Sequence, residues 1–203
     1  NRPITDVVIN ELNIIRKGKA AQLFDAPKTW GKKDEIGKEL KLKEERKMME
    51  EIGKMDSLAQ IDRIKLEDYL NKSITRKSGV KIYVIKQGKG IKPKDGNIVK
   101  IYYEGYLTNG VMFASNKKEI NEKYGYYDAE KENKGFYDPI SMELSPKMQL
   151  IEGFKEAIYT MNVGDIIYCH IPSDLAYGSE SKGNLIAPNS DLTFIIQMIT
   201  AEN

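Results

Sequence analysis

The chain has 203 residues, of which 40% are hydrophobic, and its formal net charge at pH 7 is +2. No apolar run approaches the roughly 18 residues that a membrane-spanning helix needs. Residues 1–77 include 18 basic and 14 acidic residues, whereas the remainder includes 14 basic and 16 acidic residues. Neither part has the basic excess of a dedicated nucleic-acid-binding protein, so helices that bind nucleic acid are disfavoured.

The charged N-terminal part has helical periodicity. Residues 32–54 place apolar side chains near one side of a helix, and interleaved Glu and Lys supply an exposed face. A second helix is predicted over residues 57–71, with Asp56 or Ser57 as its N-cap. Its inward residues are Leu58, Ile61, Leu66, Tyr69 and Leu70. Residues 7–15 fit a helix or a strand, and Pro27 and Gly31 break the pattern of the residues after them.

After residue 78 the pattern changes to strands. Alternating apolar residues predict strands near 80–84, 99–103, 166–171 and 192–199, and Asn109-Gly110 predicts a hairpin turn. Helical spacing predicts a short helix over 153–159, ended by a glycine turn at 162–165. This combination indicates an α+β domain, in which one short helix covers the apolar face of an antiparallel sheet. We therefore divide the chain into a helical extension, residues 1–78, and a domain, residues 79–203.

The chain has one cysteine, Cys169, and one histidine, His170. A single cysteine excludes an internal disulfide and a multi-cysteine zinc site, and a single histidine disfavours sites with several histidine ligands. In the strand over 166–171, Cys169 is expected to be a buried, inert thiol and His170, on the opposite side, to be half exposed. We therefore expect the protein to bind no metal and no cofactor. If it is an enzyme, we expect its catalysis to proceed without acid–base chemistry.

Four stretches of the second part together resemble the FK506-binding (FKBP) family of peptidyl-prolyl cis-trans isomerases. They are "VKIYYEGYLTNGVMF" (99–113), "LIEGFKEAIYTMNVGD" (150–165), "IPSDLAYG" (171–178) and "IAPNSDLTFIIQMI" (186–199), and their order matches that of the family. The resemblance covers about residues 80–203. It implies a bent antiparallel sheet wrapped around a short helix, with an apolar pocket between them.

Prolyl isomerisation suits a chain that is poor in catalytic side chains. The barrier of about 18–20 kcal/mol comes from amide resonance, which a twisted amide has lost. A twisted amide is also less polar than a planar one, so a dry aromatic pocket with one or two fixed donors favours the transition state. The reaction needs no nucleophile.

By position, the resemblance assigns two groups of pocket residues. Phe154 forms the floor, Tyr103 lies beside it, and the backbone N–H of Ile151 and the hydroxyl of Tyr177 donate to substrate carbonyls. The substrate-binding walls are Phe113, Leu150, Ile186, Phe194 and Ile140. Strand periodicity alone favours ordinary core packing for Tyr103, Phe113 and Phe194, and only the motifs around them favour the pocket. Tyr177 differs, because a tyrosine beside a glycine after a strand end is a poor core position.

Two positions depart from the family pattern. Ala114 stands where the family commonly has an aspartate that polarises the pocket rim, and Ile140 stands where it often has an aromatic residue. We therefore expect lowered isomerase activity and weak binding of macrolide ligands. The same two residues favour the alternative function, a non-catalytic binding or chaperone module that keeps the FKBP fold.

An insertion of 21 residues at 117–137 is the third departure, since family members usually have only a few residues there. It is either a flap beside the pocket that makes further contacts with the substrate, or a surface loop whose aromatic residues pack on the domain or on the N-terminal helices.

The expected partners are proline-containing peptides or unfolded proteins, with no nucleic acid. Secreted bacterial relatives commonly carry helical arms, which implies that residues 1–78 bind clients or form a homodimer. Because the chain begins at Asn1 and has little cysteine, we expect an exported protein, periplasmic or lipid-anchored, without its signal; a cytosolic fragment is the other interpretation.

Overall fold

The computed structural model of the chain describes residues 17–23 and 25–202. The predicted segment at 7–15 lies outside these residues. The chain divides into two compact units, residues 1–51 and 52–203. Within the described ranges, no helix is both long enough and apolar enough to cross a membrane.

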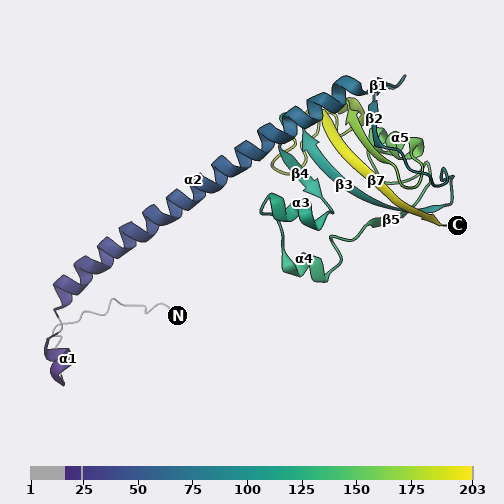
Figure 1. Cartoon of the computed structure of the whole chain (residues 1–203). Helices are drawn as coiled ribbons and strands as arrows, with labels where there is room; N and C mark the ends of the chain where they lie inside the picture. The colour runs from purple at the N-terminus through teal and green to yellow at the C-terminus, as the bar shows by residue number, and fades with distance from the viewer. Residues whose placement is uncertain (1–16, 24, 203) are drawn as a thin grey trace, which may run out of the picture. The chain divides into compact units, whose positions relative to one another are not determined.

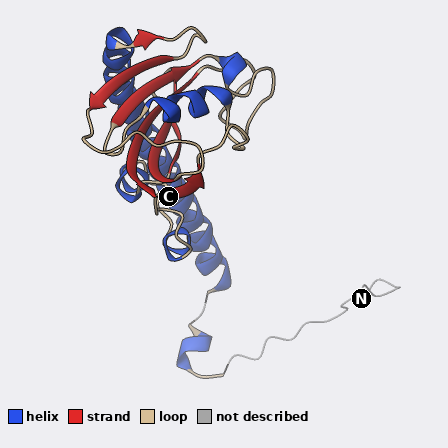
Figure 2. Cartoon of the chain, turned by 90° about the vertical axis from the view of Figure 1, so that its right-hand side faces the viewer, coloured by secondary structure: helices blue, strands red, loops and turns tan. Residues whose placement is uncertain are grey.

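The second unit is built on a seven-stranded antiparallel sheet (Figures 1 and 2). The strand order is β1-β2-β6-β7-β3-β4, and β5 pairs with β3 beyond the end of β4. The strands are β1 (Ile74–Thr75), β2 (Lys81–Lys86), β3 (Ile98–Leu107), β4 (Met112–Ser115), β5 (Ile140–Glu143), β6 (Ile166–Ile171) and β7 (Leu192–Glu202). The helices of the chain are α1 (Lys19–Gln22), α2 (Ala26–Lys72), α3 (Lys118–Lys123), α4 (Ala129–Asn133), α5 (Glu152–Thr160) and the 3₁₀ turn η1 (Ser173–Leu175).

The face of the sheet towards α5 carries the larger core, as the alternation of apolar residues predicts. Ile158 and Met161, in and just after α5, pack with the inward residues of β6 and β7. Those of β7 stand at alternate positions: Leu192, Phe194, Ile196 and Met198. Gly153 brings α5 close to the sheet, because a Cβ at this position would lie 2.3 Å from Cγ2 of Ile171. The predicted short helix and the strands over 166–171 and 192–199 are therefore confirmed.

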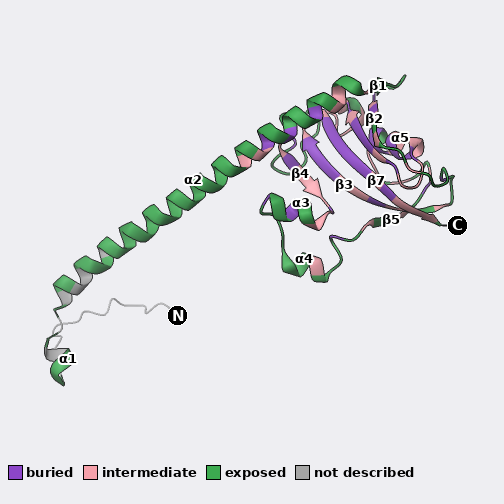
Figure 3. Cartoon of the chain, viewed as in Figure 1, coloured by how far each residue is buried: buried purple, intermediate pink, exposed green. Residues whose placement is uncertain are grey.

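The opposite face is covered by the C-terminal turns of α2, a region where Figure 3 shows buried positions on the helix. Leu66 packs there against Tyr106, Tyr168 and Ile195, which alternate along their strands with residues of the first core. The predicted hairpin at Gly110 touches the same helix. Gly110 has φ +86°, and a Cβ there would lie 2.0 Å from the carbonyl oxygen of Ala59.

Three predictions for the N-terminal part are wrong. The helices predicted at 32–54 and 57–71 form one helix, α2, because no proline lies between them and a mid-helix glycine costs only about 1 kcal/mol. Ser57 does not cap a helix; its hydroxyl donates to the Gly53 carbonyl 2.8 Å away, one turn earlier. Ile61 does not point inward but is 60% exposed, and the neighbouring Asp62, only 3% exposed, takes the buried position.

A buried polar network explains why Asp62 is accommodated. Its carboxylate accepts hydrogen bonds from the Tyr124 hydroxyl and, at 2.8 Å, from the Lys123 ammonium. Both donors belong to the insertion at 117–137, at the end of α3. The insertion is thus attached to α2 through a charge that is paired rather than isolated.

Candidate active site

A cavity of about 650 Å³ opens between α5 and the strands β3, β4 and β5. Its walls contain eight of the nine residues predicted for the site: Tyr103, Phe113, Ile140, Leu150, Ile151, Phe154, Tyr177 and Phe194. The ninth, Ile186, is buried and lines an adjoining cavity that shares Phe113 and Tyr177 with the first. Side chains that are far apart in the sequence are therefore brought to one place.

Four aromatic rings make the apolar part of the cavity. Phe194 lies at the centre, with its ring centroid 4.9 Å from that of Phe154, 5.6 Å from that of Phe113 and 6.4 Å from that of Tyr103. The first two pairs are edge-to-face, a favourable arrangement of aromatic quadrupoles. Gly105 makes room for them, because a Cβ there would lie 2.7 Å from Cζ of Phe113.

Ile151 is placed by the start of α5. It is the N-cap residue, and its carbonyl accepts the first helical hydrogen bonds, from Phe154 at 3.0 Å and Lys155 at 3.1 Å. Its own N–H makes no hydrogen bond within the described part of the chain and lies at the cavity wall. The helix therefore holds a backbone donor ready for a ligand.

Tyr177 is placed by the turn that follows β6. The 3₁₀ turn is closed by hydrogen bonds from the N–H of Leu175 to the carbonyl of Pro172 and from the N–H of Ala176 to that of Ser173, both 3.0 Å long. The N–H of Gly178 also donates to the Ser173 carbonyl at 2.7 Å, and the N–H of Ser173 donates to the Asp191 carboxylate at 2.8 Å. Within residues 17–23 and 25–202, the Tyr177 hydroxyl has no hydrogen-bond partner. The cavity thus offers a second fixed donor.

The cavity has a low dielectric. Burial, and to a smaller extent the nearby Tyr177 hydroxyl, raise the pKa of Tyr103 above its usual range, so this group stays neutral. Ala114 lies in the cavity wall, at the position where the family commonly has an aspartate. The rim therefore has no carboxylate at that position. The one acidic residue lining the cavity is Glu152, which pairs with Lys155 at 2.6 Å.

Cys169 and His170 lie outside the cavity. Complete burial raises the pKa of the Cys169 thiol to about 12, so it stays protonated, in agreement with the predicted inert thiol. The His170 side chain is only 12% exposed, less than predicted, because it packs beside Asp191, with Nε2 3.4 Å from the carboxylate. Neither residue reaches a ligand in the cavity, and neither is among the lining residues.

Sequence reasoning missed Lys182 and Met142, which also line the cavity. The Lys182 ammonium lies 5.5 Å from the centroid of the Tyr177 ring, a cation–π distance. Lys182 follows Tyr177 by five residues in a glycine-rich loop, which gives no periodic signal. Met142 lies two residues after Ile140 in β5 and therefore on the same face of the strand, so strand periodicity could have identified it.

Comparison with known proteins identifies the family. The sequence profile of the FKBP-type peptidyl-prolyl cis-trans isomerases matches residues 89–199, more than half of the chain. The chain is 34% identical over 122 residues to FK506-binding protein 1 of Dictyostelium discoideum, a match that covers 60% of this chain and 97% of the relative. It is 33% identical over 125 residues to the outer membrane protein MIP of Legionella longbeachae, covering 62% of this chain and 45% of the relative.

A solved structure supports the fold alone. The peptidyl-prolyl cis-trans isomerase of Pseudomonas syringae aligns with a TM-score of 0.50 at 24% identity, over 71% of this chain and 94% of that chain. The chain belongs to the FKBP-type peptidyl-prolyl cis-trans isomerase family, with an α+β fold and an N-terminal helical region. It spans less than half the length of the Legionella relative.

Proposed function

We propose that the cavity between α5 and the strands β3, β4 and β5, hereafter the proline cavity, binds the proline ring of an Xaa-Pro segment. There it catalyses the isomerisation of the Xaa-Pro bond in protein folding. The observation that carries this proposal is the combination of four packed aromatic rings with two donors, the Ile151 N–H and the Tyr177 hydroxyl, that have no acceptor in the described chain. Rings of this kind bind the apolar pyrrolidine, and the two donors fix the carbonyls on either side of it.

The catalytic effect comes from differential binding. Burial of the Xaa-Pro amide among Tyr103, Phe154 and Phe194 disfavours the polar planar ground state more than the less polar twisted state. The two donors hold the flanking carbonyls while the amide rotates. Ala114 removes a charge from the rim, so we expect activity below that of family members with aspartate there, and weak macrolide binding.

Replacement of Tyr177 by phenylalanine tests the proposal. Loss of one hydrogen bond worth about 1.4 kcal/mol in the transition state lowers kcat/KM roughly tenfold. The cis–trans exchange rate of a short proline peptide, followed by NMR, measures this effect, and the melting temperature shows whether the variant is folded. Equal rates for both proteins would remove Tyr177 from the mechanism.

A non-catalytic binding or chaperone module is the second candidate. Ala114 and the 40% exposed Ile140 favour it, because both leave the rim more open and less polar than the family pattern. The same exchange measurement separates the two functions: if the wild-type protein binds proline peptides without accelerating any of them, only the second candidate stands.

The N-terminal extension, residues 1–78, is proposed to bind clients or a second copy of the chain. Its support is the set of exposed apolar residues on α2: Ile36, Leu40, Met48 and Ile52. Exposed apolar side chains of this kind are suited to contact with another apolar surface. Light scattering on the purified chain determines whether it is a dimer.

We also propose that the protein is exported, in the periplasm or at a membrane through a lipid anchor. The support is the name of the Legionella relative, an outer membrane protein. Cell fractionation of the native organism tests this proposal.

A further inference from the structure

The insertion at 117–137 begins and ends on the sheet edge beside Tyr103. β4 pairs with β3 as far as Ser115 opposite Glu104, and β5 resumes the pairing at Ile140 opposite Ile101. Asn116 closes the gap: its side chain accepts from the N–H of Tyr103 at 2.7 Å and donates to the carbonyl of Asp138 at 3.0 Å. The two ends of the insertion are thus fixed next to Tyr103, a residue of the proline cavity.

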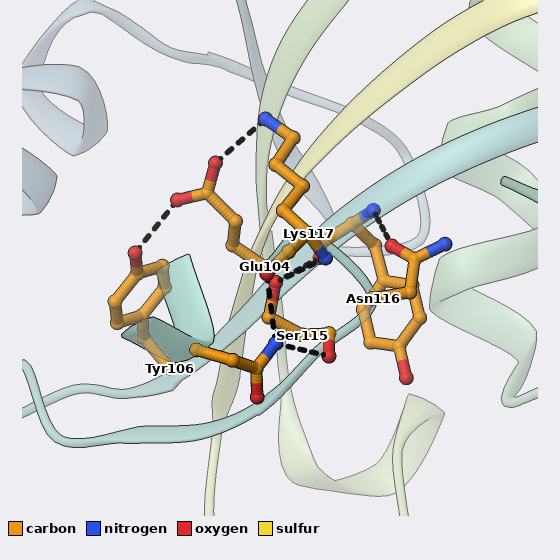
Figure 4. Close-up of polar contacts among 7 residues, drawn as sticks. Glu104, Tyr106, Ser115, Asn116 and Lys117 are labelled. Carbon is orange, nitrogen blue, oxygen red and sulfur yellow. Dashed lines mark hydrogen bonds and ion pairs between the residues drawn. The ribbon is translucent and has the colours of Figure 1, made fainter. Parts of the chain in front are cut away.

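Buried ion pairing reinforces this attachment. Glu104, 5% exposed, accepts from the Lys117 ammonium at 2.8 Å and from the Tyr106 hydroxyl at 2.7 Å, as Figure 4 shows. Ser115 adds a hydrogen bond to the Tyr103 carbonyl at 2.9 Å. The first residues of the insertion therefore have a defined position relative to β3.

The far part of the insertion is also ordered by its own contacts. Asp128 caps α4 by accepting from the N–H groups of Glu130 and Lys131, and the rings of Tyr127 and Tyr137 stack with centroids 5.7 Å apart. The N–H of Phe136 returns to the carbonyl of Lys131 at 3.0 Å. The segment 128–138 is consequently a preformed wall rather than a loose loop.

A second cavity, of about 540 Å³, lies between this wall and the sheet edge. Tyr103 and Ile140 line both this cavity and the proline cavity, so the two share a boundary. A residue in an extended chain advances by about 3.3–3.6 Å, and because the two cavities adjoin, we place a substrate residue two or three positions from the proline at the second cavity.

The second cavity is lined by two lysines and one acid. Lys131 and Lys134 form no salt bridge within the described part of the chain, and Asp138 is the acidic residue in the wall. Two acids adjoin Lys131 in the sequence. Glu132 is engaged with the Lys118 ammonium at 2.6 Å and the Tyr127 hydroxyl, and Glu130 is exposed and does not line the cavity. Two positive charges against one negative charge leave the cavity net positive.

We propose that this cavity is a specificity subsite that takes an acidic side chain of the client, two or three residues from the isomerised proline. The inference rests on the proposed isomerase function and adds a substrate class to it. The Lys131 and Lys134 ammonium groups attract the carboxylate, and Phe136, 60% exposed at the wall, packs against the apolar part of the client chain. The insertion thereby acts in substrate selection.

The test uses alanine-based peptides with one central proline and Glu, Gln or Lys placed two or three residues before or after it. Cis–trans exchange measured by NMR gives kcat/KM for each peptide without a coupling protease. For the full chain, Glu at one or more of these positions should raise kcat/KM about three- to tenfold over Lys, the effect of one or two partly exposed ion pairs. This preference should shrink at high salt.

The double variant Lys131→Glu/Lys134→Glu should reverse the order of the Glu and Lys peptides. Lys92→Glu/Lys94→Glu is the matched control, because it changes the net charge equally at exposed lysines that line neither cavity, and it should keep the wild-type order. Equal kcat/KM for Glu and Lys peptides at every position, or a preference that survives the charge reversal, overturns the subsite. Failure of all peptides, including the alanine parent, overturns the isomerase function instead.

Discussion

The two faces of the sheet are built from different chemistry. The face under α5 is aliphatic and aromatic, and it contains the proline cavity between Phe154 and Phe194. The face under α2 mixes tyrosines with buried charges, Asp62 and Glu104, each paired with groups of the insertion. One face therefore leaves an apolar cavity open, whereas the other attaches a helix and the insertion to the sheet.

Truncation of one large side chain on each face is expected to have the largest effects and to separate the two roles. Phe154→Ala should cost about 3–5 kcal/mol of stability and Leu66→Ala about 2–5 kcal/mol, because both side chains are buried. Only Phe154→Ala should also abolish peptide isomerisation by the folded fraction. Urea unfolding measures the stability, and the exchange assay below the unfolding transition measures the activity. Loss of activity in folded Leu66→Ala would break the division between the faces.

A pair of glycine substitutions tests how closely the β3–β4 hairpin rests on α2. Gly110 and Gly125 both have positive φ, and alanine in that conformation costs about 1–2 kcal/mol. A Cβ at Gly110 would also lie 2.0 Å from the Ala59 carbonyl oxygen, whereas one at Gly125 has no atom within 4 Å. Gly110→Ala should therefore lose about 1–3 kcal/mol more than Gly125→Ala in thermal or urea unfolding. Equal losses would mean that the hairpin and helix are not in contact.

The smallest expected effect is a pH dependence from His170. Burial lowers its pKa in the folded protein despite the nearby Asp191 carboxylate, so the unfolded chain binds a proton more readily. Its contribution to stability is then present above the unfolded value of about 6.5 and is lost as the pH falls towards the lower folded pKa. The melting temperature of the wild type should fall between pH 7 and pH 5 more steeply than that of His170→Gln. Parallel curves would contradict the lowered pKa.

The α5 face could be predicted from the sequence because alternation and helical spacing report directly on a one-sided apolar face. Leu192, Phe194, Ile196 and Met198 are buried together as their period of two indicates. Tyr177 and Ile151 were located only through motifs, since a turn residue and a backbone N–H have no periodicity. The roles assigned to these site residues stay predictions until the variants are measured.

The α2 face could be predicted in part, because Leu58, Leu66, Tyr69 and Leu70 pack there as their helical spacing indicates. The burial of Asp62 could not be predicted, because it depends on partners distant in sequence. A helix that buries Asp62 violates the apolar pattern, and only the Tyr124 and Lys123 groups, some 60 residues later, make that burial acceptable. The break expected between the predicted helices at 32–54 and 57–71 does not occur, and both belong to α2. The ordered structure of the insertion could not be predicted either, since it depends on the stacking of Tyr127 on Tyr137 and on the helix cap at Asp128.

The most direct test of the central claim is the isomerisation rate of a proline peptide with the wild type and the combined variant Tyr177→Phe/Phe154→Ala, each at a temperature where circular dichroism shows it to be folded. The wild-type protein should accelerate exchange and the combined variant should not exceed the uncatalysed rate, because it lacks both a fixed donor and the floor of the cavity. An unchanged rate in the combined variant would contradict the assignment of catalysis to this face of the sheet.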